Sequence, residues 1–231
     1  MTTTLGVLLD HLIDYAGLFP PAELSMPDAL RNYARYRTDE YSWALARFVV
    51  PAARLDEVDP AWPVSVIGIP AHHVEVCEIK GVQTALPDAD TAYFEIPLDS
   101  DPAPIAAMGA RAKIRMGGAS FPPCEAVAKF LRARVPFKAT AGLHHPIRNA
   151  PMHGFINLFL AAALAWRGED PLPTLEEPSA AAFHFGGDAV IWHGHTLSAA
   201  ELREVRERFA ISFGSCSFEE PIADLKALGW L

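Results

Sequence analysis

Short apolar runs alternate along the chain with segments in which apolar residues recur at helical spacing. This order is typical of a parallel sheet whose strands are joined by crossover helices. Several runs are apolar almost throughout, as expected of strands buried on both faces. The eight runs that predict strands are Leu12–Gly17, Ala46–Val50, Val64–Ile69, Val74–Ile79, Ala92–Pro97, Ala112–Met116, Phe137–Ala141 and Ala210–Gly214. We therefore expect a single α/β domain over residues 1–231, a (β/α)8 barrel of the TIM type.

The segments between these runs predict helices of unequal quality. Pro27–Arg37 begins next to Ser25, a residue that favours helix starts, and Pro123–Ala133 carries its apolar residues at helical spacing. The connections from the third run to the fourth and from the fourth to the fifth are too short for a helix, whereas a parallel crossover usually takes about a dozen residues or more. We therefore expect an irregular barrel, with an open sheet as the alternative.

A long excursion separates the seventh and eighth predicted strands. Met152–Arg167 predicts a buried helix, and the Pro- and Glu-bearing segment Leu172–Ser179 predicts a loop. Ala182–Phe185 and Ala189–His193 flank Gly-Gly-Asp, which indicates a β-hairpin. Ala199–Phe209 predicts a helix with a charged, solvated face before the chain returns to the barrel.

Composition and charge narrow the classes of partner. Hydrophobic residues make up 51% of the chain and charged residues 20%, which is enough for a sizeable core. The formal net charge of -9 disfavours nucleic acid or an anionic membrane as a partner. Cys77, Cys124 and Cys216 are odd in number and widely spaced, so a reducing compartment is favoured over a disulfide framework.

No segment has the features of export or membrane insertion. Met1–Gly6 lacks the basic region and cleavage site of a secretory signal. The longest apolar run, Phe155–Trp166, is too short to cross a bilayer, which takes about 20 residues. We therefore expect a cytoplasmic protein with no membrane partner. The same apolar run suits the interface of a homodimer.

Polar residues gather where the predicted strands end, which is where the active site of a parallel barrel lies. These residues are Asp14, Glu78, Glu95, Lys113, Arg115, Lys138 and Thr140. Because side chains alternate along a strand, Lys113 and Arg115 point the same way, and so do Lys138 and Thr140. We therefore expect the two lysines to meet in the mouth of the barrel.

Lys138 lies between two apolar residues on a central strand, where an unpaired ammonium group would be costly to bury. If Lys113 lies within a few ångströms, its like charge and the apolar surroundings would both lower the pKa of Lys138. The resulting neutral amine could attack a carbonyl carbon to form a Schiff base, with Glu95 or Glu78 moving the proton. The alternative is a structural pair between this lysine and a glutamate.

Two short segments resemble known enzyme families. Phe137–Gly142, with the sequence Phe-Lys-Ala-Thr-Ala-Gly, resembles the Lys-Thr-Ser-Thr-Gly strand of the deoxyribose-phosphate aldolase group of class I aldolases. This resemblance implies that Lys138 forms the Schiff base and that Lys113 lowers its pKa, although the order of the two lysine strands differs. Val76–Lys80 and Phe94–Glu95 are similar to the acidic strand ends of type I dehydroquinases. The whole chain is similar to a bacterial family of unassigned function, which implies no reaction.

The stretch Lys113–Pro123 indicates an anionic substrate. It runs from a strand through Gly117 and Gly118 to a proline-led helix start, where exposed backbone N–H groups favour anions. Arg115 can hold a carboxylate or a phosphate through two parallel hydrogen bonds. Plain turn chemistry is the alternative explanation of the two glycines.

Residues of the first and last strands are further candidates. Asp14 is a candidate catalytic or hydroxyl-binding group, with an ordinary polar residue at the end of a strand as the alternative. Ser215 could donate a hydrogen bond to the substrate. Cys216 precedes a predicted helix and could be a nucleophile, but neighbouring glutamates raise the pKa of a thiol, which favours a structural role. Ser217 and Glu220 fit the Ser-x-x-Glu capping box of a helix start.

His144 and His145 directly follow the seventh predicted strand and support an alternative chemistry. An imidazole pair close to Glu95 or Glu78 could bind a divalent metal. Adjacent residues of an extended chain face opposite sides, so both can be ligands only if the chain turns between them. One of the two as an acid–base group or substrate contact is therefore favoured over a metal pair.

The sequence leads to three hypotheses. The favoured one is an enzyme that acts on a small anionic carbonyl or hydroxy metabolite through a Schiff base on Lys138, without a cofactor or a metal, and catalyses aldol cleavage, dehydration or isomerisation. The second is a metal-dependent lyase or hydrolase with histidine and carboxylate ligands. The third is a non-catalytic binding module in which the charged groups merely pair.

Overall fold

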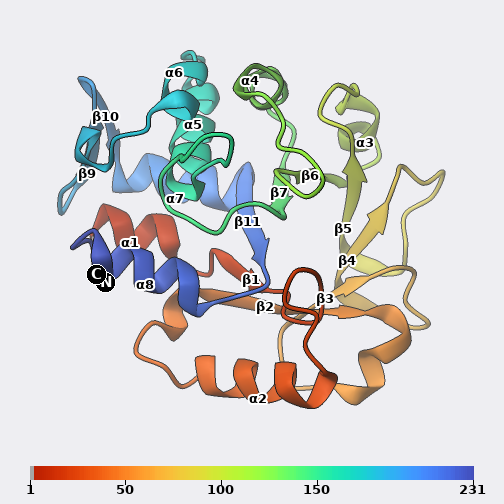
Figure 1. Ribbon diagram of the computed structural model, residues 1–231. Coiled ribbons are helices and arrows are strands. Elements are labelled where there is room, and N and C mark those ends of the chain that lie inside the picture. Colours follow the sequence, from red (N-terminus) through yellow and green to blue (C-terminus); the bar gives the residue numbers. More distant parts are fainter. Residues whose placement is uncertain (1–2) are drawn as a thin grey trace.

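Eight parallel strands close into a barrel in the computed structural model, which describes residues 3–231 (Figure 1). The hydrogen-bonded order around the barrel is β1-β11-β7-β6-β5-β4-β3-β2. Barrel strands that follow one another along the chain are therefore neighbours in space. The strands are β1 (Ile13–Tyr15), β2 (Leu45–Pro51), β3 (Val64–Ile67), β4 (Val74–Lys80), β5 (Ala89–Ile96), β6 (Arg111–Arg115), β7 (Phe137–Thr140) and β11 (Ala210–Ser215). Each predicted run overlaps one of them, and the predicted (β/α)8 fold is confirmed.

Helices follow most of the strands. They are α1 (Thr4–Leu9), α2 (Met26–Tyr36), α3 (Ala103–Ala107), α4 (Cys124–Arg132), α5 (Phe155–Arg167), α6 (Leu172–Glu176), α7 (Ala199–Arg208) and α8 (Glu219–Ala227). The start of α2 is confirmed, since the hydroxyl of Ser25 accepts a hydrogen bond from the Asp28 N–H. The loop predicted at Leu172–Ser179 is wrong in its first half, because α6 forms there over the buried side chains of Thr174 and Leu175. The amide of Asn157 on α5 donates to the carbonyl of Thr174, a tertiary contact without a local sequence signal.

One side of the barrel is built without crossover helices, as the short connections predict. Only residues 68–73 join β3 to β4, and only residues 81–88 join β4 to β5. The 3-10 helix Ala52–Glu57 contacts β2 and β3 on this side. Val66, Cys77 and Phe94 remain fully buried there, so the outer face of these strands is covered despite the missing helices.

The excursion between β7 and β11 forms a small antiparallel sheet in the order β10-β9-β8. The predicted hairpin is confirmed by β8 (Phe183–Phe185) and β9 (Ala189–Trp192). The third strand, β10 (His195–Ser198), was not predicted from the sequence. His193 and Gly194 both have positive φ, at 44° and 84°, as a two-residue hairpin turn requires. His-Gly is not one of the residue pairs that signal such a turn.

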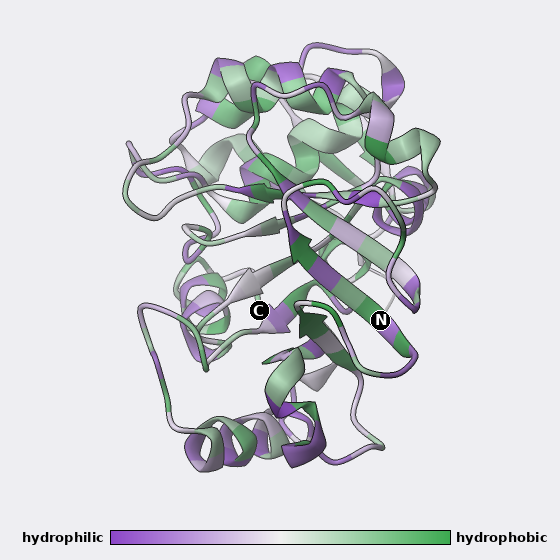
Figure 2. Cartoon of the chain, turned by 90° about the vertical axis from the view of Figure 1, so that its right-hand side faces the viewer, coloured by the Kyte–Doolittle hydropathy of each residue, from purple (hydrophilic) through white to green (hydrophobic). Residues whose placement is uncertain are grey.

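Helix α5 is enclosed by the chain itself. Every residue from Phe155 to Ala165 is buried, and the Phe155 ring stacks on Phe213 of β11 at a centroid distance of 5.1 Å. The helix therefore offers no exposed apolar face to a second copy of the chain. No helix within residues 3–231 combines the length and the apolarity needed to span a membrane. Figure 2 shows hydrophobic colour along the barrel strands, interrupted by hydrophilic positions.

A buried arginine ties together segments at the amino-terminal end of the barrel. The guanidinium of Arg206 on α7 donates to the backbone carbonyls of Leu8 at 2.9 Å, Ala210 at 2.7 Å and Asp10 at 2.9 Å, and also to that of Ile211. Burial lowers the pKa of Arg206 to about 10. Its hydrogen bonds join α7 to α1 and to the strand that closes the barrel.

We expect Arg206→Met to lower the free energy of unfolding by about 3 kcal/mol or more, because several buried carbonyls lose a charged donor at once. Urea denaturation measures the change. Arg203→Met is the matched control, since Arg203 lies on the same helix and is exposed. Equal stability of the two variants would contradict a structural role for Arg206.

Candidate functional site

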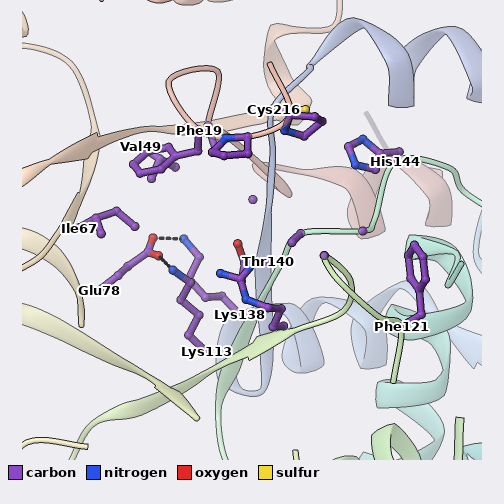
Figure 3. Close-up of a pocket in the computed structure, with 18 of the residues that line it drawn as sticks. Phe19, Val49, Ile67, Glu78, Lys113, Phe121, Lys138, Thr140, His144 and Cys216 are labelled. Carbon is purple, nitrogen blue, oxygen red and sulfur yellow. Dashed lines mark hydrogen bonds and ion pairs between the residues drawn. The ribbon is translucent and has the colours of Figure 1, made fainter. Parts of the chain in front are cut away.

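A cavity of about 600 Å³ opens at the carboxyl ends of the barrel strands (Figure 3). Its polar floor contains Glu78 of β4, Lys113 of β6 and Lys138 of β7, and Thr140 also lines it. Arg115 and His144 lie on its walls. This is the end of a parallel barrel at which catalytic residues gather, and the sequence prediction that the two lysines meet there is confirmed.

Lys138 is held by two carboxylates at the bottom of this cavity. Its ammonium group forms an ion pair with Asp14 of β1 at 2.6 Å and another with Glu78. Only 2% of the Lys138 side chain is exposed, and its nitrogen lies 5.6 Å from the centre of the Tyr93 ring. Lys138 is therefore a buried, fully paired cation.

Lys113 lies beside Lys138 in the register of β6 and β7 and shares one of its partners. Its nitrogen lies 2.9 Å from Glu78 Oε2 and 3.1 Å from Glu95 Oε2. The other oxygen of Glu95 pairs with Nε of Arg115 at 3.1 Å. The Glu78 carboxylate thus joins the two lysines, as Figure 3 shows, and Glu95 extends the network to the arginine.

Two serines complete the network and were missed by the sequence analysis. Ser65 of β3 donates to Glu78 Oε1 at 2.5 Å, and Ser212 of β11 donates to Asp14 Oδ2 at 2.7 Å. The only signal for them is position: each serine lies two residues before a cavity-lining residue, Ile67 or Gly214, and so faces inward with it. A lone serine on an apolar strand is otherwise unremarkable.

The ionisation of this network differs from the sequence prediction. Burial by itself lowers the pKa of Lys138, but the charges of Asp14 and Glu78 outweigh burial, so the pKa is raised. Burial likewise raises the pKa of Glu78, but Lys138 and Lys113 outweigh it and lower that pKa to about 2. The expectation that Lys113 lowers the pKa of Lys138 is therefore wrong, because carboxylates lie between the two ammonium groups.

Glu95 also has a lowered pKa. Its partial burial raises the pKa, but the charges of Lys113 and Arg115 and the hydrogen bonds with them outweigh this effect. The shifts of Lys138, Glu78 and Glu95 therefore all favour the charged forms of these groups, and each carboxylate of the network faces at least one cation.

Of the two glycines proposed to bind an anion, Gly117 is needed for close packing of the backbone. A Cβ on Gly117 would lie 2.7 Å from Cα of Gly142 and 2.9 Å from the Phe121 ring. The backbones that leave β6 and β7 therefore touch at Gly117, and this contact explains the glycine there. Gly118 lines the cavity with a φ of 128°.

Ser215 is turned into its own loop. Its hydroxyl donates to the carbonyl of Ser217 at 2.6 Å and accepts from the Ser217 N–H. Ser215 does not line the cavity, so the predicted hydrogen bond to a substrate is not supported. The predicted capping box is half present, because the Ser217 hydroxyl accepts from the Glu220 N–H while the Glu220 carboxylate pairs with His144.

The adjacent residues His144 and His145 face different parts of the molecule. His144 lines the cavity and pairs through Nδ1 with Glu220 at 3.1 Å, whereas His145 pairs with Asp224 at 2.6 Å and borders a separate surface groove. Both carboxylates belong to α8, one helical turn apart. Within residues 3–231, no group of three or more His, Cys, Asp or Glu side chains is arranged to hold a metal ion. The arrangement therefore gives the metal hypothesis no support.

Cys216 borders the cavity as a thiol. Burial raises its pKa, and the Glu220 charge adds to the effect, while a hydrogen bond with the backbone of Ala22 opposes it. A thiol with a raised pKa is a poor nucleophile. This agrees with the structural role favoured from the sequence.

Fold and site together define an α/β barrel with a buried lysine–carboxylate network at the carboxyl ends of its strands. Comparison with protein-family models, with curated proteins and with solved structures finds no match. Function is therefore argued from the site itself.

We expect Glu78→Gln to destabilise the protein by about 3–5 kcal/mol at pH 7, because it leaves two buried ammonium groups short of a partner. The lowered pKa of Glu78 also gives a stabilisation that is complete above the unfolded-state pKa near 4.5 and disappears as the pH falls towards 2. Urea denaturation from about pH 6 to pH 3 should therefore show a shallower loss of stability in the variant than in the wild type. Glu125→Gln, on an exposed position of α4, is the control. It should change neither the stability at pH 7 nor the loss of stability as the pH falls.

We expect Gly117→Ala to lower the free energy of unfolding by about 1–3 kcal/mol, because the added methyl group collides with the Gly142 backbone. Gly187→Ala is the matched control, since a Cβ there has no neighbour within 4 Å. Thermal unfolding of both variants measures the difference. A Gly117→Ala variant as stable as the wild type would contradict the close contact.

Proposed function

We propose that the protein is an enzyme that forms an imine between a buried lysine and a small carbonyl compound, and that uses this imine for carbon–carbon cleavage, dehydration or isomerisation. The observation that carries the proposal is the pair of lysines that share the Glu78 carboxylate on the floor of the barrel cavity. Amine nucleophiles are activated by a neighbouring cation and by partial desolvation. Proton carriers, Glu78 and Glu95, lie within hydrogen-bond distance of the amine.

The contacts favour Lys113 as the amine, whereas the sequence resemblance favoured Lys138. If Lys113 loses its proton, Glu78 keeps Lys138 and Ser65 as partners, and Glu95 keeps Arg115. No buried carboxylate is left alone. If Lys138 loses its proton, Asp14 keeps only the Ser212 hydroxyl and the Arg47 N–H. Since unpaired buried charges are costly, Lys113 is the amine that can be deprotonated at the lower cost.

The imine step conserves atoms and charge. The ammonium group of Lys113 passes a proton to Glu95, and its freed lone pair forms the bond between Nζ and the carbonyl carbon. The carbonyl π electrons move to oxygen, which takes up protons and leaves as water. Overall, the ammonium group and the carbonyl compound give an iminium ion and one water molecule. The iminium ion then attracts electrons from a bond at the neighbouring carbon, as the proposed lyase and isomerase reactions require.

The other residues of the cavity have roles that follow from their positions. Arg115 offers N–H groups for a substrate carboxylate, as proposed from the sequence, because only its Nε is engaged with Glu95. Lys138 keeps Glu78 ionised and in place. Thr140 and His144, which both line the cavity, are placed to bond to a substrate oxygen.

Borohydride reduction tests the proposal, because hydride adds to the iminium carbon and fixes the substrate on the lysine. With a panel of keto acids, aldehydes and sugar phosphates, we expect the peptide that contains Lys113 to gain the mass of one panel member less one oxygen. Lys113→Arg keeps the positive charge but cannot form the imine, so it should abolish labelling. Lys138→Arg should retain labelling at Lys113, and Lys129→Met on an exposed position of α4 is the control.

The outcomes separate the hypotheses. A label on Lys138 in the wild-type protein would overturn the choice of lysine and keep the imine. No label with any panel member would overturn the imine proposal and favour a binding module. Peptide mapping of the wild-type protein gives this answer even if a lysine variant does not fold.

A further inference from the structure

We infer that the substrate is a keto acid with an apolar body, aromatic or branched aliphatic, and that it is not a sugar phosphate. The carbonyl part of this inference rests on the proposed imine chemistry. The apolar body and the single carboxylate rest on the shape and lining of the cavity alone, so the two parts can fail separately.

Apolar side chains form the cavity wall above the charged floor. They come from the loop after β1, from the ends of β2 and β3 and from the loop after β6, and are Phe19, Pro20, Pro21, Val49, Ile67 and Phe121. In Figure 3, Ile67, Val49 and Phe19 lie on one side of the space above Thr140. Phe121 lies on the other side of this space. A sugar phosphate would find few hydrogen-bond partners on these walls, whereas an apolar body would lose its contact with water there.

The size of the cavity also favours a substrate with an apolar body. Its volume of about 600 Å³ lies within the range of roughly 300–1,000 Å³ that is typical of sites for ligands much larger than pyruvate. A keto acid of only six heavy atoms would leave most of this space to water between apolar walls. Binding sites bury most of the surface of their ligands. A ring or a branched chain beside the carbonyl group fills the space that the smallest keto acids leave empty.

The charges of the site suit one carboxylate and not a phosphate. Lys113 and Lys138 each hold two carboxylates already. Among residues 3–231, Arg115 shows a hydrogen bond only from Nε, so its two terminal nitrogens remain for one carboxylate. At the rim, His144 is held by Glu220, whose charge would repel a dianion. A doubly charged phosphate would therefore lack the cations it needs.

Exposed apolar side chains also lie in the loops after β3 and β4. Ile69 follows the cavity residue Ile67 by two positions and is 72% exposed. Val82 and Leu86, in the loop after β4, are also exposed large hydrophobic residues. These loops begin at the carboxyl ends of β3 and β4, the same end of the barrel as the cavity, and exposed apolar side chains there suit an apolar substrate body better than a charged one.

Two measurements with defined probes test the inference. The probes are phenylpyruvate, 4-methyl-2-oxopentanoate, pyruvate and glyceraldehyde 3-phosphate, and the measurements are the half-saturating concentration for borohydride labelling and the shift in melting temperature without borohydride. We expect phenylpyruvate or 4-methyl-2-oxopentanoate to half-saturate at a concentration about tenfold or more below that of pyruvate. Phe121→Ala should remove most of this difference between the apolar keto acids and pyruvate. It should change the half-saturating concentration of pyruvate by less than about twofold. Phe185→Ala, a half-buried phenylalanine of the β8–β10 sheet, is the matched control and should change neither.

The results distinguish the proposed apolar body from the proposed imine. Labelling by pyruvate or glyceraldehyde 3-phosphate at equal or lower concentration than the apolar keto acids would overturn the apolar body and keep the imine. A melting-temperature shift with phenylpyruvate that Phe121→Ala removes, without labelling of any lysine, would support the apolar body and overturn the imine. Absence of both labelling and shift with all four probes would overturn both.

Discussion

One carboxylate, that of Glu78, holds both lysines of the cavity floor, and the rest of the site depends on it. Each of its oxygens faces one ammonium group, and the Ser65 hydroxyl supports one of them. Buried charges are tolerated only when they are paired and hydrogen-bonded. Asp14 and Glu95 each provide a second carboxylate for one of the two lysines, so charges from β1, β4, β5, β6 and β7 depend on one another.

This dependence relates the stability of the barrel to its reactivity. The carboxylates that make the lysines acceptable in the interior also raise the pKa of Lys138, which opposes nucleophilic attack by its amine. The proposed imine chemistry therefore needs a lysine whose partners have other cations to face, and Lys113 has this property because Glu78 and Glu95 are both shared. The same sharing holds the amine in one position, which favours attack on a carbonyl carbon placed above it.

The sequence predicts the framework of the site better than its ionisation. Apolar runs of strand length predict the eight strands, and alternation along β6 and β7 correctly predicts that Lys113 and Lys138 face the same space. The raised pKa of Lys138 could not be predicted, because it depends on Asp14, 124 positions away in the chain. Ser65, Ser212 and the turn of Ser215 into its own loop also depend on three-dimensional contacts that no local pattern records. The close packing at Gly117 could not be predicted for the same reason, since its neighbour Gly142 lies on another loop.

The side of the barrel that lacks crossover helices has a consequence for how this site can diversify. The charged floor is contributed by strands that are tied together by ion pairs, and a change in any of them disturbs the others. The short loops after β3 and β4 carry none of these pairs, and each contains exposed hydrophobic residues. Surface loops tolerate insertions and substitutions far better than buried strands. Under the proposed function, changes in these two loops would therefore alter which substrate body is accepted while the chemistry of the floor stays the same.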